Sequence, residues 1–280
     1  MVYPAKAKFN NQKPKVLLNF NQVFTIIKKL GEGSFGLVVK VQDDSGKYYA
    51  LKMLKSYDDS AFHEIETLIA LQKYPQFKTS IVQYYDYFIF NKYLCILMEF
   101  IDGIDAQKYF KQPFGLEDFL KFAKWLTFTI SELHKLDYVH RDIKPENIMV
   151  TKTGYKLIDF GLSCRTKNKD PLSCTRSLAG SPVFMSPELW YGFYKKNIYK
   201  YYKTSDVYAA GVTLYYILSN EYPYQYNNEG RVIGKIYKPI DIHPKQYQGI
   251  NKIIHTMVYL NPDNRLTALQ AFNQFKKYKN

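Results

Sequence analysis

The chain has 280 residues, of which 46% are hydrophobic and 23% are charged, a composition typical of a globular protein with one large domain or two packed lobes. Its formal net charge of +14 would suit nucleic acid, anionic lipid or acidic protein as a partner, but we favour a lysine-rich solvated surface. No apolar stretch approaches the roughly 18 residues that span a bilayer, and lysines interrupt the first residues, so the sequence predicts neither a membrane helix nor a signal peptide.

The three cysteines are Cys95, Cys164 and Cys174. Because an odd number cannot form a complete disulfide framework, we interpret them as favouring a reducing compartment. Cys164 and Cys174 lie in one polar segment, where a structural role is favoured over redox sensing. The sequence also shows no motif for the common lipid anchors. We therefore expect an intracellular protein, cytoplasmic or nuclear, without a membrane partner.

Residues 1–23 are polar and basic and contain two prolines, which predicts a poorly ordered basic extension. From residue 24 onward, short β-like runs separated by glycines and turns indicate strands. Apolar residues at helical spacing indicate one helix that begins near Asp58 and ends before Pro75. The predicted strands cover residues 24–30, 37–42, 47–54, 81–88 and 93–100. Together these elements predict a small antiparallel sheet with one helix.

After Gly103 the pattern becomes helical, beginning with one apolar stripe between residues 119 and 133. Residues 159–188 are polar and rich in Ser and Thr, and a loop of about 30 residues inside a compact domain is usually functional. Further helices are predicted at residues 205–218, 249–260 and 267–278. The sequence thus predicts a β-rich lobe and an α-rich lobe that are joined near residues 99–105.

A glycine-rich turn, Gly31-Glu-Gly-Ser-Phe-Gly36, lies between two predicted strands and is followed by Val38. Backbone N–H groups of such a turn can bind phosphate oxygens, although a plain hairpin turn would look the same. A strand follows it, which counts against a dinucleotide fingerprint. Lys52, at the end of a predicted strand, and Glu64, on the next helix, form either a buried pair or a solvated surface pair.

The stretch His140-Arg-Asp-Ile-Lys-Pro-Glu-Asn147 packs an imidazole, two cations, two carboxylates and an amide into eight residues. A further acid follows in Asp159-Phe-Gly161. Two acids and an amide in this order suit Mg²⁺-assisted transfer of a phosphoryl group.

This ordered series of motifs resembles the eukaryotic protein kinase family over residues 24–278. The resemblance implies an α+β, bilobal protein-kinase-like fold, with a small antiparallel β-rich N-lobe that carries one key helix and a larger, mainly α-helical C-lobe. It places the N-lobe at about residues 24–100, the hinge at about 99–105 and the C-lobe at about 106–278.

The resemblance also implies a role for each matched residue. Asp142 is the catalytic base, and Lys144 neutralises charge on the transferred phosphoryl group. Lys52, held by Glu64, pairs with the other phosphates. Mg²⁺, for which Mn²⁺ can substitute, is held by Asn147 and Asp159. The loop over the ATP phosphates comprises Gly31, Gly33, Ser34, Phe35 and Gly36.

Adenine and ribose sites follow from the same resemblance. It places Val38 and Ala50 above the adenine and Met149 below it. It places Met98 at the gatekeeper position and Asp105 at a ribose contact. The hinge residues whose backbone bonds the base edge are Glu99, Phe100 and Ile101.

Lys144 and the segment Gly180–Glu188 resemble the Ser/Thr-specific kinases, which implies protein substrates with Ser or Thr acceptors. Ser177 matches the site at which an upstream kinase, or the chain itself, phosphorylates the loop, with Thr175 and Ser173 as alternatives. Leu178, Pro182 and Met185 match an apolar substrate pocket. Three positions match those that some relatives use to bind an upstream arginine, namely Glu146, Asp105 and Tyr216.

Further resemblances concern the C-lobe. Asp206 with Gly211 matches the anchor of a long central helix, and Arg265 matches the buried partner of Glu188. Residues 75–80 depart from the family's usual link between helix and strand.

Two other hypotheses stay open. A catalytically weak pseudokinase or scaffold would have lost a key residue, whereas Lys52, Asp142, Asn147 and Asp159 are all present. A basic nucleic-acid-associated protein on a kinase fold would show a reading module or an aromatic-interleaved basic stripe, and we find none. The sequence leaves the oligomeric state open.

Overall fold

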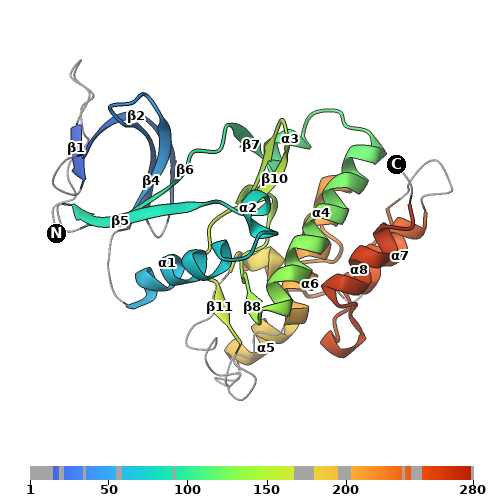
Figure 1. Ribbon diagram of the computed structural model, residues 1–280. Coiled ribbons are helices and arrows are strands. Elements are labelled where there is room, and N and C mark those ends of the chain that lie inside the picture. The colour runs from blue at the N-terminus through green and yellow to red at the C-terminus, as the bar shows by residue number, and fades with distance from the viewer. Residues whose placement is uncertain are drawn as a thin grey trace. The chain divides into compact units, whose positions relative to one another are not determined.

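The computed structural model describes residues 15–18, 22–33, 36–54, 59–90, 93–166, 180–194, 203–234, 237–240 and 248–278 (Figure 1). The chain divides into two compact units. Unit 1 comprises Met1–Lys73 and Val82–Asp102, and unit 2 comprises Tyr74–Ile81 and Gly103–Asn280. The predicted N-lobe is therefore not one continuous stretch, because residues 74–81 belong to unit 2. This is the segment in which the sequence departs from the family pattern.

Unit 1 contains a six-stranded, fully antiparallel sheet in the order β1-β2-β3-β4-β6-β5. Its strands are β1 (Lys15–Leu18), β2 (Gln22–Glu32), β3 (Gly36–Gln42), β4 (Tyr48–Leu54), β5 (Tyr84–Phe90) and β6 (Tyr93–Glu99). The helix α1 (Asp59–Gln72) packs against β5. Every strand and the helix predicted for this part of the chain are confirmed. The structure adds β1, which lies inside the predicted poorly ordered extension and pairs with β2.

Alternation along the strands gives the sheet of unit 1 two different faces. One face forms a hydrophobic core made of Phe24, Val39, Val41, Leu51, Phe88, Cys95 and Leu97. Successive side chains of a strand point to opposite faces, so Val38, Ala50 and Met98 lie on the other face. Lys52 shares that second face, because it is the cross-strand partner of Val38. The strand register therefore places the hydrophobic core on one face of the sheet and the residues predicted to bind a nucleotide on the other face.

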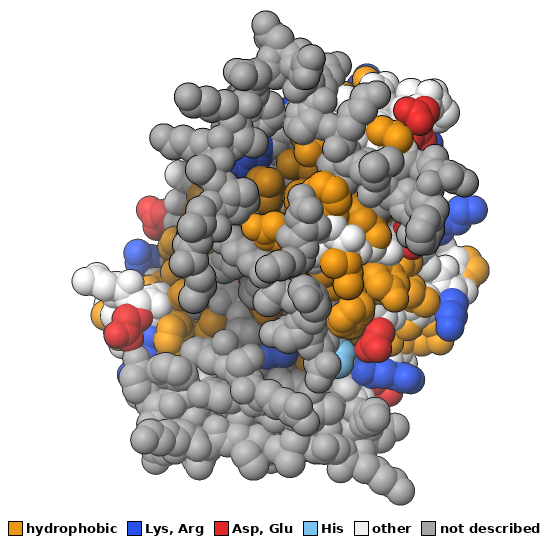
Figure 2. All heavy atoms as spheres, turned by 90° about the vertical axis from the view of Figure 1, so that its left-hand side faces the viewer, with side chains coloured by type: hydrophobic (Ala, Val, Ile, Leu, Met, Phe, Trp, Pro, Cys, Tyr) orange, Lys and Arg blue, Asp and Glu red, His pale blue; other side chains and the backbone are white. Residues whose placement is uncertain are grey.

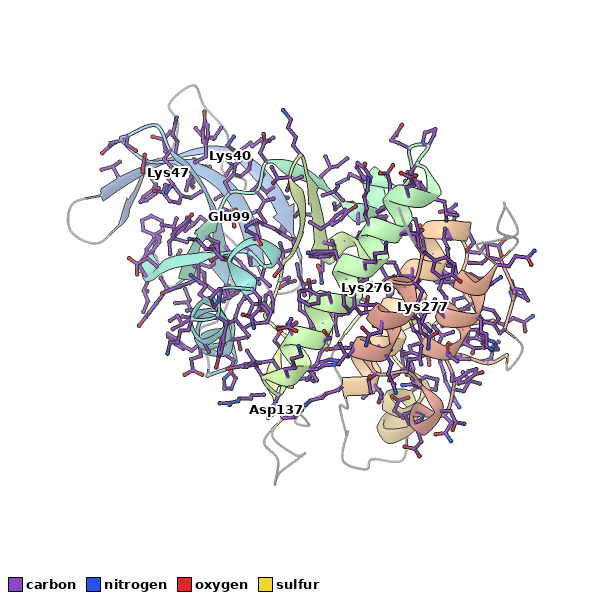
Figure 3. All side chains as sticks on the ribbon, turned by 45° about the vertical axis from the view of Figure 1, so that its right-hand side comes forward. Lys40, Lys47, Glu99, Asp137, Lys276 and Lys277 are labelled. Carbon is purple, nitrogen blue, oxygen red and sulfur yellow. The ribbon has the colours of Figure 1, made fainter. Side chains whose placement is uncertain are left out.

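The outer surface of unit 1 is rich in exposed aromatic and aliphatic side chains. On the edge strand β5, Tyr85, Tyr87 and Ile89 are exposed, and Figure 2 shows hydrophobic side chains gathered on the side of the molecule toward which β5 extends. Lysines lie over some of these rings: Lys47 is 5.0 Å from the ring centroid of Tyr85, and Lys40 lies over Tyr48 and Phe100 (Figure 3). These are cation–π contacts, in which the ammonium group itself lies over the ring.

Unit 2 is mainly helical. Its helices are α2 (Phe77–Ser80), α3 (Ala106–Tyr109), α4 (Leu116–Lys135), α5 (Pro187–Tyr194), α6 (Lys203–Ser219), α7 (Gly249–Met257) and α8 (Ala268–Phe275). A small sheet has the order β10-β9-β7, with β7 (Gly103–Asp105), β9 (Ile148–Thr151) and β10 (Gly154–Leu157), and β8 (Tyr138–Val139) pairs with β11 (Cys164–Arg165). The four long helices predicted here are confirmed, and α4 and α8 pack side by side (Figure 1). No described helix is long and apolar enough to cross a membrane.

The cysteines depart from the expectation that was based on their odd number. Cys95 is a buried free thiol in the core of unit 1, and burial raises its pKa to about 12. Cys164, in β11, is disulfide-bonded. Its expected neighbour Cys174 lies outside the described residues. An odd count therefore did not mean that all three cysteines are thiols.

The central helix of unit 2 is α6, which is buried along most of its length, including the side chains of Tyr208 and Tyr215. Gly211 lets this helix approach α7 closely. A Cβ atom at Gly211 would lie 2.6 Å from Val258 Cγ1 and 2.9 Å from Met257 Cβ. The glycine is therefore required by packing and not by backbone conformation.

We expect Gly211→Ala to lower the free energy of unfolding by about 1–3 kcal/mol, because overpacking outweighs the better helix propensity of alanine. Urea denaturation measures this change. Gly115→Ala is the matched control at the start of α4, where a Cβ atom would meet only Asp118 Oδ2 at 3.9 Å. The control should cost less than about 1 kcal/mol. Equal losses for the two variants would contradict the packing argument.

Candidate active site

The loop between β8 and β9 contains the predicted catalytic stretch and is anchored to α6 by Asp206. The Asp206 carboxylate accepts hydrogen bonds from the backbone N–H groups of His140 (2.8 Å) and Arg141 (2.9 Å). His134 Nε2, on α4, lies 3.1 Å from the same carboxylate. Burial opposes ionisation of Asp206, but these groups, chiefly His134, outweigh it and hold its pKa below the usual value. The predicted anchor is confirmed, and the loop backbone is fixed to a buried charge.

Asp142, the predicted base, is buried at 7% exposure and is held from several sides. Its Oδ1 accepts hydrogen bonds from both the backbone N–H and the hydroxyl of Ser181, each at 2.9 Å. Its Oδ2 accepts from Asn147 Nδ2 at 2.8 Å and lies 2.9 Å from Lys144 Nζ. Lys144 Nζ also donates to Ser181 Oγ at 2.6 Å. Asp142, Lys144 and Asn147, predicted separately from the sequence, therefore meet within unit 2.

His140 connects the loop of Asp142 to the segment of Asp159. Its Nδ1 lies 3.3 Å from the backbone N–H of Asp142, its Nε2 lies 3.2 Å from the carbonyl oxygen of Ile158, and its ring packs edge-on against Phe160. Burial lowers its pKa, and the carboxylates of Asp206, Asp142 and Asp159 oppose that shift in decreasing order. A neutral imidazole that accepts through Nδ1 and donates through Nε2 satisfies both hydrogen bonds.

Two residues of unit 2, Asn147 and Asp159, were predicted as ligands of Mg²⁺. Both hydrogen bonds of the Asn147 amide use Nδ2, one to the carbonyl oxygen of Asp142 and one to its carboxylate, so Oδ1 is the atom with which Asn147 can bind a cation. Asp159 has a left-handed backbone with φ 62°. Among the described residues no cluster of three or more His, Cys, Asp or Glu forms a metal centre. One amide and one carboxylate oxygen suit Mg²⁺, which usually keeps waters and phosphates as its other ligands.

Lys52 and Glu64 form a buried ion pair within unit 1. Lys52 Nζ, on β4, donates to both carboxylate oxygens of Glu64 on α1, at 2.9 and 2.7 Å. Lys52 is 7% and Glu64 2% exposed, so the pair is the buried one and not the solvated alternative. The pair holds the Lys52 amine on the sheet face that carries Val38, Ala50 and Met98.

The glycine-rich turn joins β2 to β3, and its glycines have different neighbours. A Cβ atom at Gly36 would lie 2.0 Å from the carbonyl oxygen of Met53, so this position needs glycine for strand packing. Cβ atoms at Gly31 and Gly33 would meet nothing within 4 Å, and the backbone N–H of Gly33 donates to the carbonyl oxygen of Gly36 at 2.9 Å. Ser34 and Phe35 lie outside the described residues.

The remaining predicted nucleotide contacts are divided between the units. Glu99 and Ile101 belong to unit 1, and Asp105 and Met149 are cross-strand partners in unit 2. Asp105 caps α3 by accepting from the backbone N–H of Lys108 at 2.9 Å, and its other oxygen pairs with Lys108 Nζ at 2.6 Å. The carboxylate proposed for ribose is thus already engaged locally.

The loop after Arg165 is described only at its ends. Ser173, Thr175, Ser177 and Leu178, which were predicted as phosphorylation sites or as part of the substrate pocket, lie outside the described residues. The described part resumes at Gly180 and contains Ser181 and the short helix η3 (Pro182–Phe184).

The predicted pair of Glu188 and Arg265 is confirmed. Arg265 donates to both oxygens of Glu188 at 2.7 Å, and its remaining N–H groups reach the carbonyl oxygens of Thr204, Tyr259 and Leu260. Burial opposes ionisation of Glu188, but the hydrogen bonds and charge of Arg265 outweigh it and hold its pKa below 4.5. The pair ties the start of α5 to the segment before α8.

Two features of unit 2 were missed in the sequence. His134 supports Asp206, and its spacing of four residues from Ile130 on the apolar stripe of α4 was a signal that it is buried. The second feature is a stack of Tyr216 on Tyr222, with ring centroids 5.3 Å apart, which no local sequence pattern indicates.

Comparison with known proteins matches residues 24–275 to a family described as protein kinase domain. Serine/threonine-protein kinase Nek3 of Mus musculus is 30% identical over 256 residues, which cover 88% of this chain and 48% of that protein. Serine/threonine-protein kinase 10 of Danio rerio is 31% identical over 90% of this chain and 26% of that protein. Serine/threonine-protein kinase cds1 of Schizosaccharomyces pombe is 27% identical over 96% of this chain and 61% of that protein. The chain therefore matches only 26% to 61% of the length of these relatives.

We expect Arg265→Met to lower the free energy of unfolding by about 3–5 kcal/mol, because it leaves the Glu188 carboxylate buried without its partner. The double variant Glu188→Gln, Arg265→Met should cost less than the sum of the two single variants, because the residues are in direct contact. Urea denaturation of the four proteins measures this coupling. Additive losses would contradict it.

The same pair makes stability depend on pH in a defined direction. Since the folded pKa of Glu188 lies below its ordinary value of 4.5, the pair stabilises the protein above that pH, and its contribution is lost as the pH falls through the folded pKa. The stability difference between the wild type and the double variant should therefore shrink in acid.

Proposed function

Because the chain belongs to the protein kinase domain family, we propose that it is an ATP-dependent serine/threonine protein kinase. It transfers the γ-phosphoryl group of Mg-ATP to Ser or Thr hydroxyls of protein substrates. The observation that carries the proposal is the arrangement of Asp142, in which a buried carboxylate is oriented by Asn147, Ser181 and Lys144.

Asp142 acts as the base. In this proposal an acceptor hydroxyl approaches the carboxylate at the position beside Ser181, and Asp142 orients it and takes its proton as the transfer proceeds. Lys144, held 2.9 Å from Asp142, lies close enough to neutralise charge on the phosphoryl group as it moves. The hydrogen bonds to Ser181 and Asn147 fix both side chains before the substrate arrives, so little reorganisation is needed.

Nucleotide binding is assigned residue by residue. In unit 1, Lys52 would bind the α- and β-phosphates, with Glu64 holding its amine in place. The turn of Gly31 and Gly33, where no neighbouring atom lies within 4 Å of a Cβ position, would approach the phosphates. The apolar sheet face of Val38, Ala50 and Met98 would contact adenine, and the backbone of Glu99 and Ile101 would bond its edge. In unit 2, Met149 would contact adenine, and Asp105 would reach the ribose only if it released Lys108.

Asn147 and Asp159 would hold Mg²⁺. The bound ion would neutralise the phosphate charge and align the phosphates. Asn147 itself contributes orientation: its Nδ2 donates to Asp142, so its Oδ1 would be the atom that holds the ion.

Serine or threonine specificity is supported by Lys144 and Ser181. The Ser181 hydroxyl donates to Asp142 and accepts from Lys144, a contact that a threonine would also make. The named relatives in the comparison are serine/threonine-protein kinases.

A pseudokinase would be expected to have lost one of the catalytic residues or their contacts. In unit 1 the Lys52–Glu64 pair is intact, and in unit 2 Asp142 is held in one orientation. These contacts support catalysis over a purely scaffolding role.

We expect Asp142→Asn to lower kcat for peptide phosphorylation by about 10²–10⁴-fold, because the base is lost. The affinity for ATP should change little, since Asp142 is not assigned to the nucleotide. Radiolabelled transfer and fluorescent nucleotide binding measure the two effects. Asp118→Asn, an exposed acid on α4, is the matched control and should leave both unchanged. Undiminished transfer by Asp142→Asn would refute the assignment of the base.

Control by phosphorylation is proposed for Ser177, with Arg141 as the cation that the phosphate would engage. We expect Ser177→Ala to lower kcat/KM about tenfold or more, the effect of one or two charge-assisted hydrogen bonds. Phosphatase treatment of the wild type should give the same loss, and mass spectrometry should locate the phosphate. Thr175→Ala and Ser173→Ala serve as controls. Full activity of the dephosphorylated wild type would show that no loop phosphate is required.

A further inference from the structure

An apolar strip runs along the seam where α4 and α8 pack side by side in unit 2 (Figure 1). The rings of Phe128, on α4, and Phe272, on α8, have their centroids 5.2 Å apart. One helical turn away, Ser131 of α4 and Leu269 of α8 line the same cavity. Phe128 is 38% and Leu269 43% exposed, although both are large apolar side chains. We call Phe128, Phe272 and Leu269 the α4–α8 strip.

A cavity of about 200 Å³ lies at the Leu269 end of this strip. Val207 of α6 and Ala268 of α8 line it together with Leu269, and Lys135 and Lys203 line it as well. Sites for small molecules usually measure roughly 300–1,000 Å³, so this cavity is too small for a typical organic ligand. Its volume suits a single apolar side chain.

Two polar side chains of the cavity already have hydrogen bonds. Ser131 Oγ donates to the carbonyl oxygen of Phe128 at 2.8 Å, and Thr267 Oγ1 accepts from the backbone N–H of Gln270 at 3.2 Å. An apolar side chain that entered the cavity would leave both groups satisfied, so its binding would not carry the cost of an unpaired polar atom.

Lysines surround the strip. Lys135 and Lys203, at the cavity, each pair with one acid through side chains that are 55% and 42% exposed. Lys276 Nζ lies 6.0 Å from the ring centroid of Phe272, and Lys277 follows it in the chain (Figure 3). Because the two acids are matched by the first two lysines, Lys276 and Lys277 give the surface around the strip an excess of positive charge.

We propose that the α4–α8 strip binds an acidic amphipathic helix of a partner protein. Leu269 and Phe272 are three residues apart, which is about 4.5 Å along the axis of α8. A third helix presents apolar side chains with the same spacing at positions i, i+3, i+4 and i+7. One of these side chains would fill the cavity and the next would lie on Phe128, while acidic residues on the flanks would face the lysines.

The proposal is independent of the proposed kinase function. It assigns a place and a chemistry to one of the partners that a net charge of +14 would suit, an acidic protein.

Other occupants match the strip less well. An extended strand cannot be added, because the backbone N–H groups of a helix interior are bonded within the helix. A second copy of this chain carries the same net charge of +14 and would be repelled. An anionic membrane binds apolar side chains that protrude from a surface, whereas this strip ends in a cavity between helices.

The test uses the full chain and a fluorescein-labelled peptide of about 18 residues, long enough to form a helix. The peptide carries leucines at positions i, i+3, i+4 and i+7 of successive turns and glutamate or alanine elsewhere. One matched peptide replaces its glutamates by lysine, and another replaces its leucines by serine. Fluorescence anisotropy should show binding of the acidic leucine peptide alone, and added salt should weaken it.

Leu269→Glu should raise the Kd of the acidic leucine peptide roughly tenfold or more, because it removes an apolar contact and repels the glutamates. The new acid lies in the first turn of α8, where negative charge suits a helix, so the fold should persist and circular dichroism should show an unchanged melting transition. Lys135→Gln should raise the Kd about threefold, the effect of one exposed charge. Ile233→Glu and Lys238→Gln, at exposed positions outside α4 and α8, are the matched controls and should leave the Kd unchanged.

Three results would overturn the proposal. The first is equal binding of all three peptides, or a Kd that Leu269→Glu does not change. The second is binding to phosphatidylserine vesicles, lost in Leu269→Glu, without binding of the peptide, which would assign the strip to a membrane. The third is a dimer in sedimentation velocity that Leu269→Glu dissociates, which would assign it to a second copy. Anisotropy needs no phosphoryl transfer, so failure of the proposed kinase function would leave these results unaffected.

Discussion

The carboxylate of Asp206 is buried in α6, where it could not stay charged without the groups that surround it. An unpaired charge at 2% exposure costs several kcal/mol, whereas here two backbone N–H groups and His134 satisfy it. Movement of His140 or Arg141 would remove one of the hydrogen bonds that stabilise this charge. The same anchor stabilises the left-handed backbone of Arg141 (φ 72°), which costs roughly 1–2 kcal/mol by itself. The hydrogen bonds of Asp206 to His140 and Arg141 therefore fix the backbone that leads directly into Asp142.

Two buried ion pairs fix other parts of the structure in the same way, because a buried charge must keep its partner. Lys52 with Glu64 in unit 1 and Glu188 with Arg265 in unit 2 each bury opposite charges that cannot separate without a large desolvation cost. Such pairs contribute little net stability compared with apolar residues of the same size, so their value lies in fixing geometry. In unit 1 the pair holds the Lys52 amine on the sheet face opposite the hydrophobic core. In unit 2 the pair joins the start of α5 to the segment before α8.

Much of this arrangement could be predicted from the sequence, because long elements and motif residues leave strong local signals. The strands from β2 onward in unit 1, the long helices, and the Lys52–Glu64 and Glu188–Arg265 pairs follow from alternation, helical spacing and motif order. Strands of two to four residues, such as β8 and β11, are too short to show a period. The assignment of residues 74–81 to unit 2, the β1–β2 pairing and the Tyr216–Tyr222 stack depend on contacts between distant segments, which no local pattern encodes.

The charge of the chain illustrates how local geometry overrides composition. The excess of 14 positive charges describes the whole surface, yet the groups around Asp142 are paired one by one. Lys144 faces both Asp142 and Ser181, and Lys108 neutralises Asp105. Because fields from distant lysines are screened within about 8 Å, a bound side chain responds mainly to the few groups that it touches. A protein that is basic overall can therefore keep a carboxylate such as Asp142 in a setting that its immediate neighbours determine.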